Sequence, residues 1–354
     1  MLGADTQAAA RPRQPVGIDA KLGPQWAQRQ KPALLVLVVG ETARAANWGL
    51  AGYARQTTPE LAAIPELISF NQATSCGTNT ETSVPCMFSP WGRRHYDEAR
   101  IRGSESLLHV LQHAGVDVLW RDNQSGCKGV CDGVPSEVMG AAHDPALCDG
   151  ERCLDEILLH GLDQRLSAAK PGPQVLVLHQ LGNHGPAYYK RYPTAFRRFV
   201  PPCDSADLRQ CSREQIVNAY DNALLYTDHV LAQLIAQLKA RQDTLDSAVL
   251  YVSDHGESLG EGGLYLHGMP YAIAPEVQTH VPFVMWLSPA FSRDTGVNEA
   301  CLRAEAAKQP VSHDNLFHSL LGIFDVQTQA YERGLDLFAA CRGPAAASVA
   351  GTKP

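Results

Sequence analysis

Three short, mainly apolar runs constrain the fold more than any other feature of the sequence. They span residues 33–39, 174–179 and 248–253, and glycine and polar residues follow each of them closely. A run of this kind, without regular polar alternation, is typical of a strand buried on both faces of a parallel sheet. Two further runs, at residues 116–120 and 281–286, fit strands of the same sheet.

Segments with helical periodicity alternate with these strands. The strongest is residues 213–241, where apolar residues recur every three or four positions. Shorter amphipathic segments span residues 105–113, 154–168 and 313–324, and the sequence after Asn79 is also suited to begin a helix. The alternation predicts an α/β fold in which helices sandwich a mainly parallel central sheet.

The composition favours one folded domain with loose ends. With 354 residues, of which 45% are hydrophobic and 19% charged, the chain can bury a substantial core. We expect a single domain over residues 32–342, a loose linker over residues 1–31 and a loose tail over residues 343–354. The net charge of −7 gives no support for nucleic-acid binding, and a monomer is the simplest expectation.

Ten cysteines indicate an oxidising compartment, because most of them lie at short spacings in polar sequence. The closely spaced pairs and the two remaining cysteines are Cys76/Cys86, Cys127/Cys131, Cys148/Cys153, Cys203/Cys211, Cys301 and Cys341. A zinc ribbon formed by the second and third pairs is an alternative, ranked below disulfides because the other pairs lack zinc-finger spacing. Spacing alone leaves the connectivity open.

The cysteines imply export, yet residues 1–31 contain no apolar signal-peptide core. No stretch of the chain has the roughly 20 consecutive apolar residues that cross a membrane. We therefore expect a soluble fragment of an exported or membrane-anchored parent that has lost its N-terminal targeting or membrane segment.

Groups that bind metals or protons follow three of the expected strands. Glu41 lies just past the first strand, His184 follows the strand at residues 174–179, and Asp254 and His255 follow the strand at residues 248–253. Because parallel strands end at one edge of a sheet, these side chains are expected to gather there, together with His267 from a later glycine-rich segment.

The hydroxyl-rich segment from Ser75 to Cys86 offers a nucleophile to the same place. If Cys76 and Cys86 are bonded, the segment becomes a tight loop with Thr80 near its middle. A threonine hydroxyl is a poor nucleophile at neutral pH, so it needs a metal ion that favours its alkoxide.

Two carboxylates, an imidazole and a hydroxyl oxygen make a mixed ligand set suited to tetrahedral zinc. The expected ligands are Glu41, Thr80, Asp254 and His255. The other two histidines, His184 and His267, are expected to hold a second metal, or to contact a phosphate and protonate the leaving oxygen. Lys128, between two cysteines, is placed to offset phosphate charge.

Four segments closely resemble the lipid A phosphoethanolamine transferases, the family that includes the mobile colistin-resistance enzymes. They are residues 40–44 (Gly-Glu-Thr-Ala-Arg), 76–86, 179–186 (His-Gln-Leu-Gly-Asn-His-Gly-Pro) and 253–261 (Ser-Asp-His-Gly-Glu-Ser-Leu-Gly-Glu). The resemblance covers residues 32–338 and implies an alkaline phosphatase/sulfatase-like fold. It also implies a periplasmic catalytic domain that, in family members, follows a bundle of transmembrane helices.

The resemblance implies a reaction and roles for the candidate residues. Thr80 matches the family nucleophile, and Glu41, Thr80, Asp254 and His255 match its zinc ligands. His184 and His267 match second-metal or substrate positions, and Lys128 matches a substrate-contacting lysine. The implied activity transfers phosphoethanolamine from phosphatidylethanolamine to lipid A, at the periplasmic face of the bacterial inner membrane, through a phosphothreonine-type intermediate. Such a transfer confers resistance to cationic peptides such as polymyxin and colistin.

Other functions remain as alternatives. A transferase acting on a core sugar or another periplasmic glycan would use the same site, and so would a phosphodiesterase. A sulfatase is disfavoured, because the segment Ser83–Met87 lacks the arginine that follows the oxidised residue in sulfatases. A non-catalytic zinc-binding or lipid-sensing domain is disfavoured by the presence of a nucleophile with a full ligand set.

Overall fold

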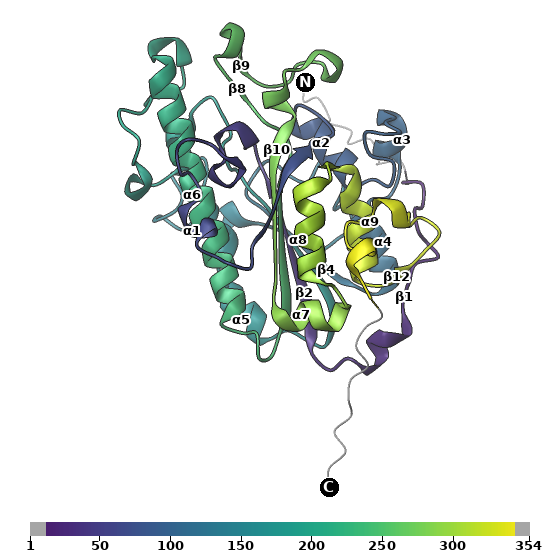
Figure 1. Ribbon diagram of the computed structural model, residues 1–354. Helices are drawn as coiled ribbons and strands as arrows, with labels where there is room; N and C mark the ends of the chain where they lie inside the picture. The colour runs from purple at the N-terminus through teal and green to yellow at the C-terminus, as the bar shows by residue number, and fades with distance from the viewer. Residues whose placement is uncertain (1–11, 344–354) are drawn as a thin grey trace, which may run out of the picture.

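The computed structural model of the protein describes residues 12–343 (Figure 1). An eight-stranded mixed sheet forms its centre. The order of its strands is β11-β3-β10-β7-β2-β6-β4-β5. Their bounds are β2 (Pro32–Gly40), β3 (Ile68–Thr74), β4 (Asp117–Asp122), β5 (Ser136–Val138), β6 (Gly172–His179), β7 (Asp246–Ser253), β10 (His280–Leu287) and β11 (Val311–Ser312). All five strands expected from the sequence are present.

Strand β2 is the centre of the sheet and runs parallel to both of its neighbours, β6 and β7. Its side chains alternate between two buried clusters, with Leu35 and Leu37 in one and Leu34 and Val36 in the other. A strand buried on both faces has no polar alternation, which is why the run was recognisable. The α/β sandwich predicted from the sequence is confirmed.

Strand β10 runs antiparallel to β7 and β3, whereas the other pairings in the sheet are parallel. The sheet is therefore mainly parallel, as expected. Strand β3 was not recognised in the sequence, since it mixes buried Ile68 and Phe70 with exposed Asn71 and Gln72. Such a pattern lacks the continuous apolar run that marks the central strands.

Helices cover both faces of the sheet, as Figure 1 shows for α6 on one side and for α8 and α9 on the other. The helices are α1 (Pro59–Ala62), α2 (Thr80–Met87), α3 (Glu98–Gly103), α4 (Leu107–Ala114), α5 (Leu162–Ser167), α6 (Arg213–Lys239), α7 (Pro289–Thr295), α8 (Glu299–Lys308) and α9 (Asp314–Ile323). None of the helices in the described part of the chain combines the length and the apolar character needed to cross a bilayer.

The long helix α6 begins at a capping box. The Ser212 side chain accepts from the Gln215 N–H, and the Gln215 side chain accepts from the Ser212 N–H. Residues of its apolar stripe, such as Ile216 and Leu224, pack into the cluster on one face of the sheet. The helix ends at Lys239, two residues before the expected end.

The prediction of a single amphipathic helix over residues 154–168 is wrong. The chain forms a 3₁₀ helix over Asp155–Leu159 and then α5, and it turns between them at Gly161, whose φ is 66°. The left-handed Gly161 ends the first segment, and Asp155 anchors that segment, because its buried carboxylate accepts the backbone N–H groups of Leu181 and Gly182. These bonds tie the start of the segment to the loop after β6.

The expectation of a loose linker is wrong for residues 12–31. Strand β1 (Lys21–Leu22) pairs with β12 (Val326–Gln327), and Trp26 is only 8% exposed. The Trp26 indole donates a 2.7 Å hydrogen bond to the Phe324 carbonyl and packs against its ring. Val16 and Ala20 are buried in the same cluster as Trp26, so three apolar side chains anchor this segment. The rest of the predicted linker and nearly all of the predicted tail lie outside the described residues.

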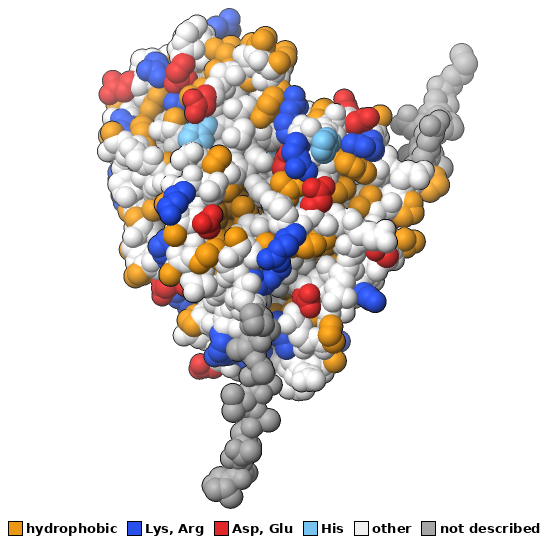
Figure 2. Space-filling model, turned by 45° about the vertical axis from the view of Figure 1, so that its right-hand side comes forward, with side chains coloured by type: hydrophobic (Ala, Val, Ile, Leu, Met, Phe, Trp, Pro, Cys, Tyr) orange, Lys and Arg blue, Asp and Glu red, His pale blue; other side chains and the backbone are white. Residues whose placement is uncertain are grey.

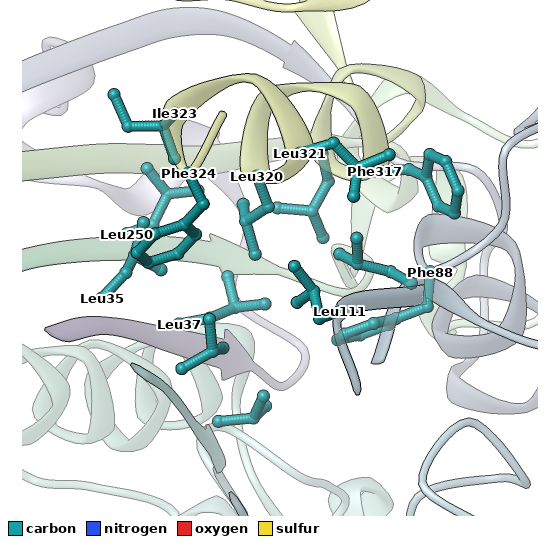
Figure 3. Packing of buried hydrophobic residues seen from close by; sticks show 14 of the residues in the cluster. Leu35, Leu37, Phe88, Leu111, Leu250, Phe317, Leu320, Leu321, Ile323 and Phe324 are labelled. Atoms are coloured by element: carbon teal, nitrogen blue, oxygen red, sulfur yellow. The ribbon is translucent and has the colours of Figure 1, made fainter. Parts of the chain in front are cut away.

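One hydrophobic cluster joins the central strands to helices from distant parts of the sequence (Figure 3). Leu37 of β2 and Leu250 of β7 lie beside Leu320 and Phe324 at α9 and beside Phe88, which follows α2. All five side chains are buried. The core therefore holds α2 against the sheet, and α2 begins at the candidate nucleophile Thr80.

All ten cysteines are paired in disulfides. The bonds are Cys76–Cys86, Cys127–Cys131, Cys148–Cys153, Cys203–Cys211 and Cys301–Cys341. The four short-spaced pairs are those expected from the sequence, and the two remaining cysteines bond to each other. These pairings exclude the zinc-ribbon alternative, which needs four thiolates free to bind one metal.

The burial of Trp26 generates a stability prediction. Trp26→Ala is expected to lower the free energy of unfolding by about 3 kcal/mol, because a large buried side chain is lost. Trp26→Phe keeps most of the packing but loses the hydrogen bond to Phe324, so about 1 kcal/mol should be lost. Urea denaturation followed by circular dichroism measures both changes. The control is Gln28→Ala, at a nearby exposed position; equal stability of all variants would contradict the observed packing.

Candidate metal centre and nucleophile

The register of the central strands places two carboxylates side by side. Gly40 of β2 lies opposite Ser253 of β7, so Glu41 and Asp254 are the next residues of adjacent parallel strands. The Asp254 N–H donates to the Gly40 carbonyl at 2.9 Å, and the Thr42 N–H donates to the Asp254 carboxylate at 3.1 Å. Both carboxylates are buried at the carboxyl edge of the sheet.

A histidine and a threonine complete the cluster. Candidate ligand atoms of Glu41, Asp254 and His255 all lie within 4.8 Å of one another. The Thr80 hydroxyl oxygen lies 2.9 Å from Glu41 Oε2 and 2.7 Å from Asp254 Oδ2. The structure thus brings together the four residues that the sequence proposed as ligands and nucleophile.

Thr80 is the first residue of α2 and does not lie in the middle of a loop as expected. The Asn79 side chain caps this helix by accepting the Thr82 N–H at 2.8 Å. The Cys76–Cys86 disulfide ties the preceding turn to the end of the helix. Thr80 is 9% exposed, and its hydroxyl faces the cluster through the contacts with Glu41 and Asp254.

The electrostatics of the cluster call for a cation. Burial and the neighbouring charge of Glu41 raise the pKa of Asp254 to about 6. Burial opposes the charged form of His255, but the carboxylates of Asp254 and Glu41 raise its pKa to about 10. The two buried carboxylates therefore hold a proton on the imidazole, whose positive charge offsets part of their negative charge. A bound divalent cation would offset more of it.

The donor atoms fit such a cation. His255 Nδ1 lies 2.7 Å from the Gly256 carbonyl, which only accepts, so Nδ1 carries a proton and Nε2 is the nitrogen that can bind a metal. His255 Nε2 is buried, has no hydrogen-bond partner among the described residues, and lies 3.3 Å from Glu41 Oε1. One imidazole nitrogen with carboxylate and hydroxyl oxygens is a donor set that zinc accepts.

Two more predicted histidines lie at the rim of the cluster. His184 Nδ1 is 3.8 Å from Glu41 Oε1, and the His267 ring centroid is 4.1 Å from that of His255. Both are half-buried, so a substrate can reach them. The relation of Lys128 to the cluster is less direct, because its ammonium is paired at 2.9 Å with the Glu81 carboxylate on the outer side of α2.

Sequence reasoning missed the residues that hold the cluster in place. Glu257 is fully buried, and its carboxylate lies 2.7 Å from His267 Nδ1 and 2.6 Å from the Tyr188 hydroxyl. The Gln124 amide donates to Glu41 Oε2 at 3.2 Å. Proximity to Asp254 and His255 in the sequence could have drawn attention to Glu257, whereas nothing in the local sequence marks Gln124.

Comparison with known proteins agrees with this fold and site. The sulfatase family model matches residues 33–326. The chain is 46% identical over 327 residues to phosphoethanolamine transferase EptA of Salmonella typhimurium, covering 92% of this chain and 59% of that protein. It is 44% identical over 303 residues to phosphatidylethanolamine transferase Mcr-1 of Escherichia coli, covering 84% of this chain and 54% of that protein.

Among solved structures, the soluble domain of lipooligosaccharide phosphoethanolamine transferase A from Neisseria meningitidis is 47% identical, with a TM-score of 0.90. The match covers 95% of this chain and all of that domain. This chain belongs to the sulfatase family and, within it, to the phosphoethanolamine transferases. It spans 59% of the length of the EptA protein that it matches.

The cluster generates a prediction for metal content. Asp254→Asn and His255→Ala each remove one candidate ligand, and each should weaken metal retention by at least about tenfold. The measurement is metal per chain by inductively coupled plasma mass spectrometry after extensive dialysis. Asp243→Asn, at an exposed position, is the matched control. Wild-type metal content in both cluster variants would contradict the assignment of these side chains as ligands.

Proposed function

We propose that this chain is a zinc-dependent transferase that moves phosphoethanolamine from phosphatidylethanolamine to a phosphate of lipid A. The observation that carries the proposal is the position of the Thr80 hydroxyl, within hydrogen-bond distance of the buried carboxylates of Glu41 and Asp254. The names of the EptA, Mcr-1 and lipooligosaccharide transferase relatives support the transferred group, the donor and the acceptor class.

Thr80 carries the group between donor and acceptor in this proposal. Its oxygen attacks the donor phosphorus, the bond from phosphorus to the diacylglycerol oxygen breaks, and phosphoethanolamine becomes attached to Thr80. The hydroxyl proton leaves toward Asp254 Oδ2, which lies 2.7 Å away. Zinc held by Glu41, Thr80, Asp254 and His255 would lower the pKa of the hydroxyl and polarise a phosphoryl oxygen.

The histidines at the rim supply the remaining proton transfers. We assign His267 as the acid that protonates the departing diacylglycerol oxygen, because it is partly exposed and the Glu257 carboxylate fixes its orientation. In the second step, a phosphate oxygen of lipid A attacks the phosphorus, and Thr80 leaves and regains its proton. His267 then takes the proton released by the acceptor, so the cycle closes.

His184 and Lys128 have supporting roles in this proposal. His184, beside Glu41, contacts the phosphate or holds a second metal. Lys128 lies next to Glu81 on the first turn of α2, and a phosphate entering above Thr80 offers it a second anionic partner. The ammonium added to lipid A lowers its negative charge and thereby its attraction for cationic peptides such as colistin. Disulfide pairing fits the periplasmic side of the inner membrane.

The nucleophile assignment predicts a specific loss of activity. Thr80→Ala should lower the rate of phosphoethanolamine transfer by about a thousandfold or more while leaving the fold intact. Thr80→Ser keeps a hydroxyl and should retain measurable transfer. Thr82→Ala, on the same helical turn, is the control. The rate is measured with a labelled short-chain donor, and wild-type transfer by Thr80→Ala would contradict the proposal.

The covalent intermediate distinguishes transfer from the alternatives. After incubation with the donor alone, wild-type protein should gain the mass of one phosphoethanolamine group, located on Thr80 by peptide mass spectrometry. Adding lipid A should discharge the adduct onto the acceptor. Discharge to water at the same rate with and without lipid A would identify a phosphodiesterase, and discharge only to a core sugar would identify the other transferase alternative.

A further inference from the structure

An exposed apolar segment follows the rim histidine His267. Residues 268–275 read Gly-Met-Pro-Tyr-Ala-Ile-Ala-Pro, and none of them is buried. We call this segment the apolar loop. It contains a 3₁₀ turn over Tyr271–Ile273, and Ile273 is 67% exposed. Single exposed apolar residues such as Ile18 occur elsewhere on the surface, but Ile273 belongs to a charge-free run of eight residues that follows a histidine of the candidate site.

The apolar loop is fixed to the segment that carries the nucleophile. The Gly268 N–H donates to the Thr78 carbonyl at 3.0 Å, and the Thr78 hydroxyl donates to the Met269 carbonyl at 2.6 Å. Further along, the Tyr271 hydroxyl donates to the Ser75 carbonyl at 3.0 Å. The loop therefore lies beside the entrance to Thr80, at the end of the molecule where β8 (Ser258–Leu259) and β9 (Tyr265–Leu266) project in Figure 1.

One stacked arginine contacts the apolar loop, and a second stacks on Trp91, which packs on the same small cluster as Tyr96. The Arg93 guanidinium lies 3.8 Å from the centroid of the Tyr271 ring and 4.9 Å from that of Tyr96. Nearby in the sequence, the Arg100 guanidinium stacks 4.3 Å from the Trp91 ring. Within residues 12–343, no carboxylate lies within 4.0 Å of either guanidinium; Arg93 instead donates to the Cys76 carbonyl at 3.4 Å, and Arg100 donates to the His95 carbonyl at 3.0 Å. Figure 2 shows hydrophobic, basic and acidic side chains intermixed on the upper part of the molecule.

Aromatic rings, arginines and an exposed aliphatic tip are the side chains that favour a bilayer interface. The rings and the aliphatic tip suit the boundary between headgroups and acyl chains, and arginines suit lipid phosphates. Although the chain carries a net charge of −7, neither of these two arginines is paired with a carboxylate, so their positive charge is available to a lipid phosphate. An anionic phospholipid surface matches both the apolar loop and the positive charge of Arg93 and Arg100.

We propose that the apolar loop inserts into the headgroup region of an anionic phospholipid bilayer, with Arg93 and Arg100 contacting lipid phosphates. The purpose of this contact rests on the proposed function, since the donor phosphorus lies at the depth where an interfacial segment sits. The loop then holds the entrance to Thr80 at that depth. The donor headgroup can be reached without the lipid leaving the bilayer.

The test compares two equally exposed isoleucines. Ile273→Asp places a charge on the apolar loop, and Ile18→Asp places it near β1, on another part of the surface, where Ile18 is 70% exposed. Binding is measured by sedimentation of the full chain with vesicles of phosphatidylethanolamine and phosphatidylglycerol. Ile273→Asp should weaken vesicle partitioning about tenfold, whereas Ile18→Asp should leave it unchanged. No binding by the wild-type chain, or equal binding by all three proteins, would overturn the proposal.

Charge is tested with a second pair of conditions. Replacing phosphatidylglycerol by phosphatidylcholine should weaken wild-type binding, and the arginine variant Arg100→Gln should be less sensitive to that replacement. Concentration-dependent dimers that disappear in Ile273→Asp would instead show that a second copy covers the loop, and would overturn the proposal. Thermal denaturation of each variant confirms that it is folded.

Activity separates this proposal from the proposed function. Ile273→Asp should lose transfer from donors embedded in vesicles but keep transfer from a water-soluble short-chain donor. Equal transfer from both donors would overturn the role of the loop. Vesicle binding does not depend on catalysis. The binding result can therefore be interpreted even if Thr80 proves not to be the nucleophile. Vesicle binding by inactive Thr80→Ala should equal that of the wild type.

Discussion

The site depends on the parallel pairing of β2 with β7, which buries the carboxylates of Glu41 and Asp254 next to each other. Two like charges taken out of water repel each other, and each has lost its hydration. Hydrogen bonds from the Thr42 N–H and the Gln124 amide offset part of this cost, and a cation or bound protons would offset more of it. The sheet itself therefore creates the demand for positive charge that His255 partly meets and that a metal ion would meet more fully.

A second constraint acts on the nucleophile. Thr80 gains its position from three independent attachments: the Asn79 cap, the Cys76–Cys86 disulfide and the hydrophobic contacts of the residues at the end of α2. A hydroxyl held in this way loses little conformational freedom when substrate arrives. The same segment supports the apolar loop through Ser75 and Thr78, so the surface proposed to meet lipid and the reacting oxygen share one rigid support.

The sequence predicted the strand ends well because buried parallel strands have a simple signature, and Glu41 and Asp254 directly follow two of them. Features that depend on tertiary contacts were not predictable. Asp155 is tied to a loop over twenty residues later, and the burial of Trp26 depends on Phe324 near the other end of the chain. The local sequence says nothing about either of these contacts. Gln124 reaches Glu41 only once the strands that precede them, β4 and β2, lie in the same sheet.

The pairing of β1 with β12 makes the order of synthesis matter. Lys21 and Leu22 leave the ribosome long before Val326 and Gln327 exist, so the first strand must wait for almost the whole chain before its partner is available. Contacts between residues this far apart in sequence form late and slowly. A chain that terminates early keeps Trp26 uncovered, and an uncovered tryptophan on an unpaired strand is a feature that quality-control factors can recognise. The pairing of β1 with β12 can therefore form only after residues 326 and 327 have been synthesised.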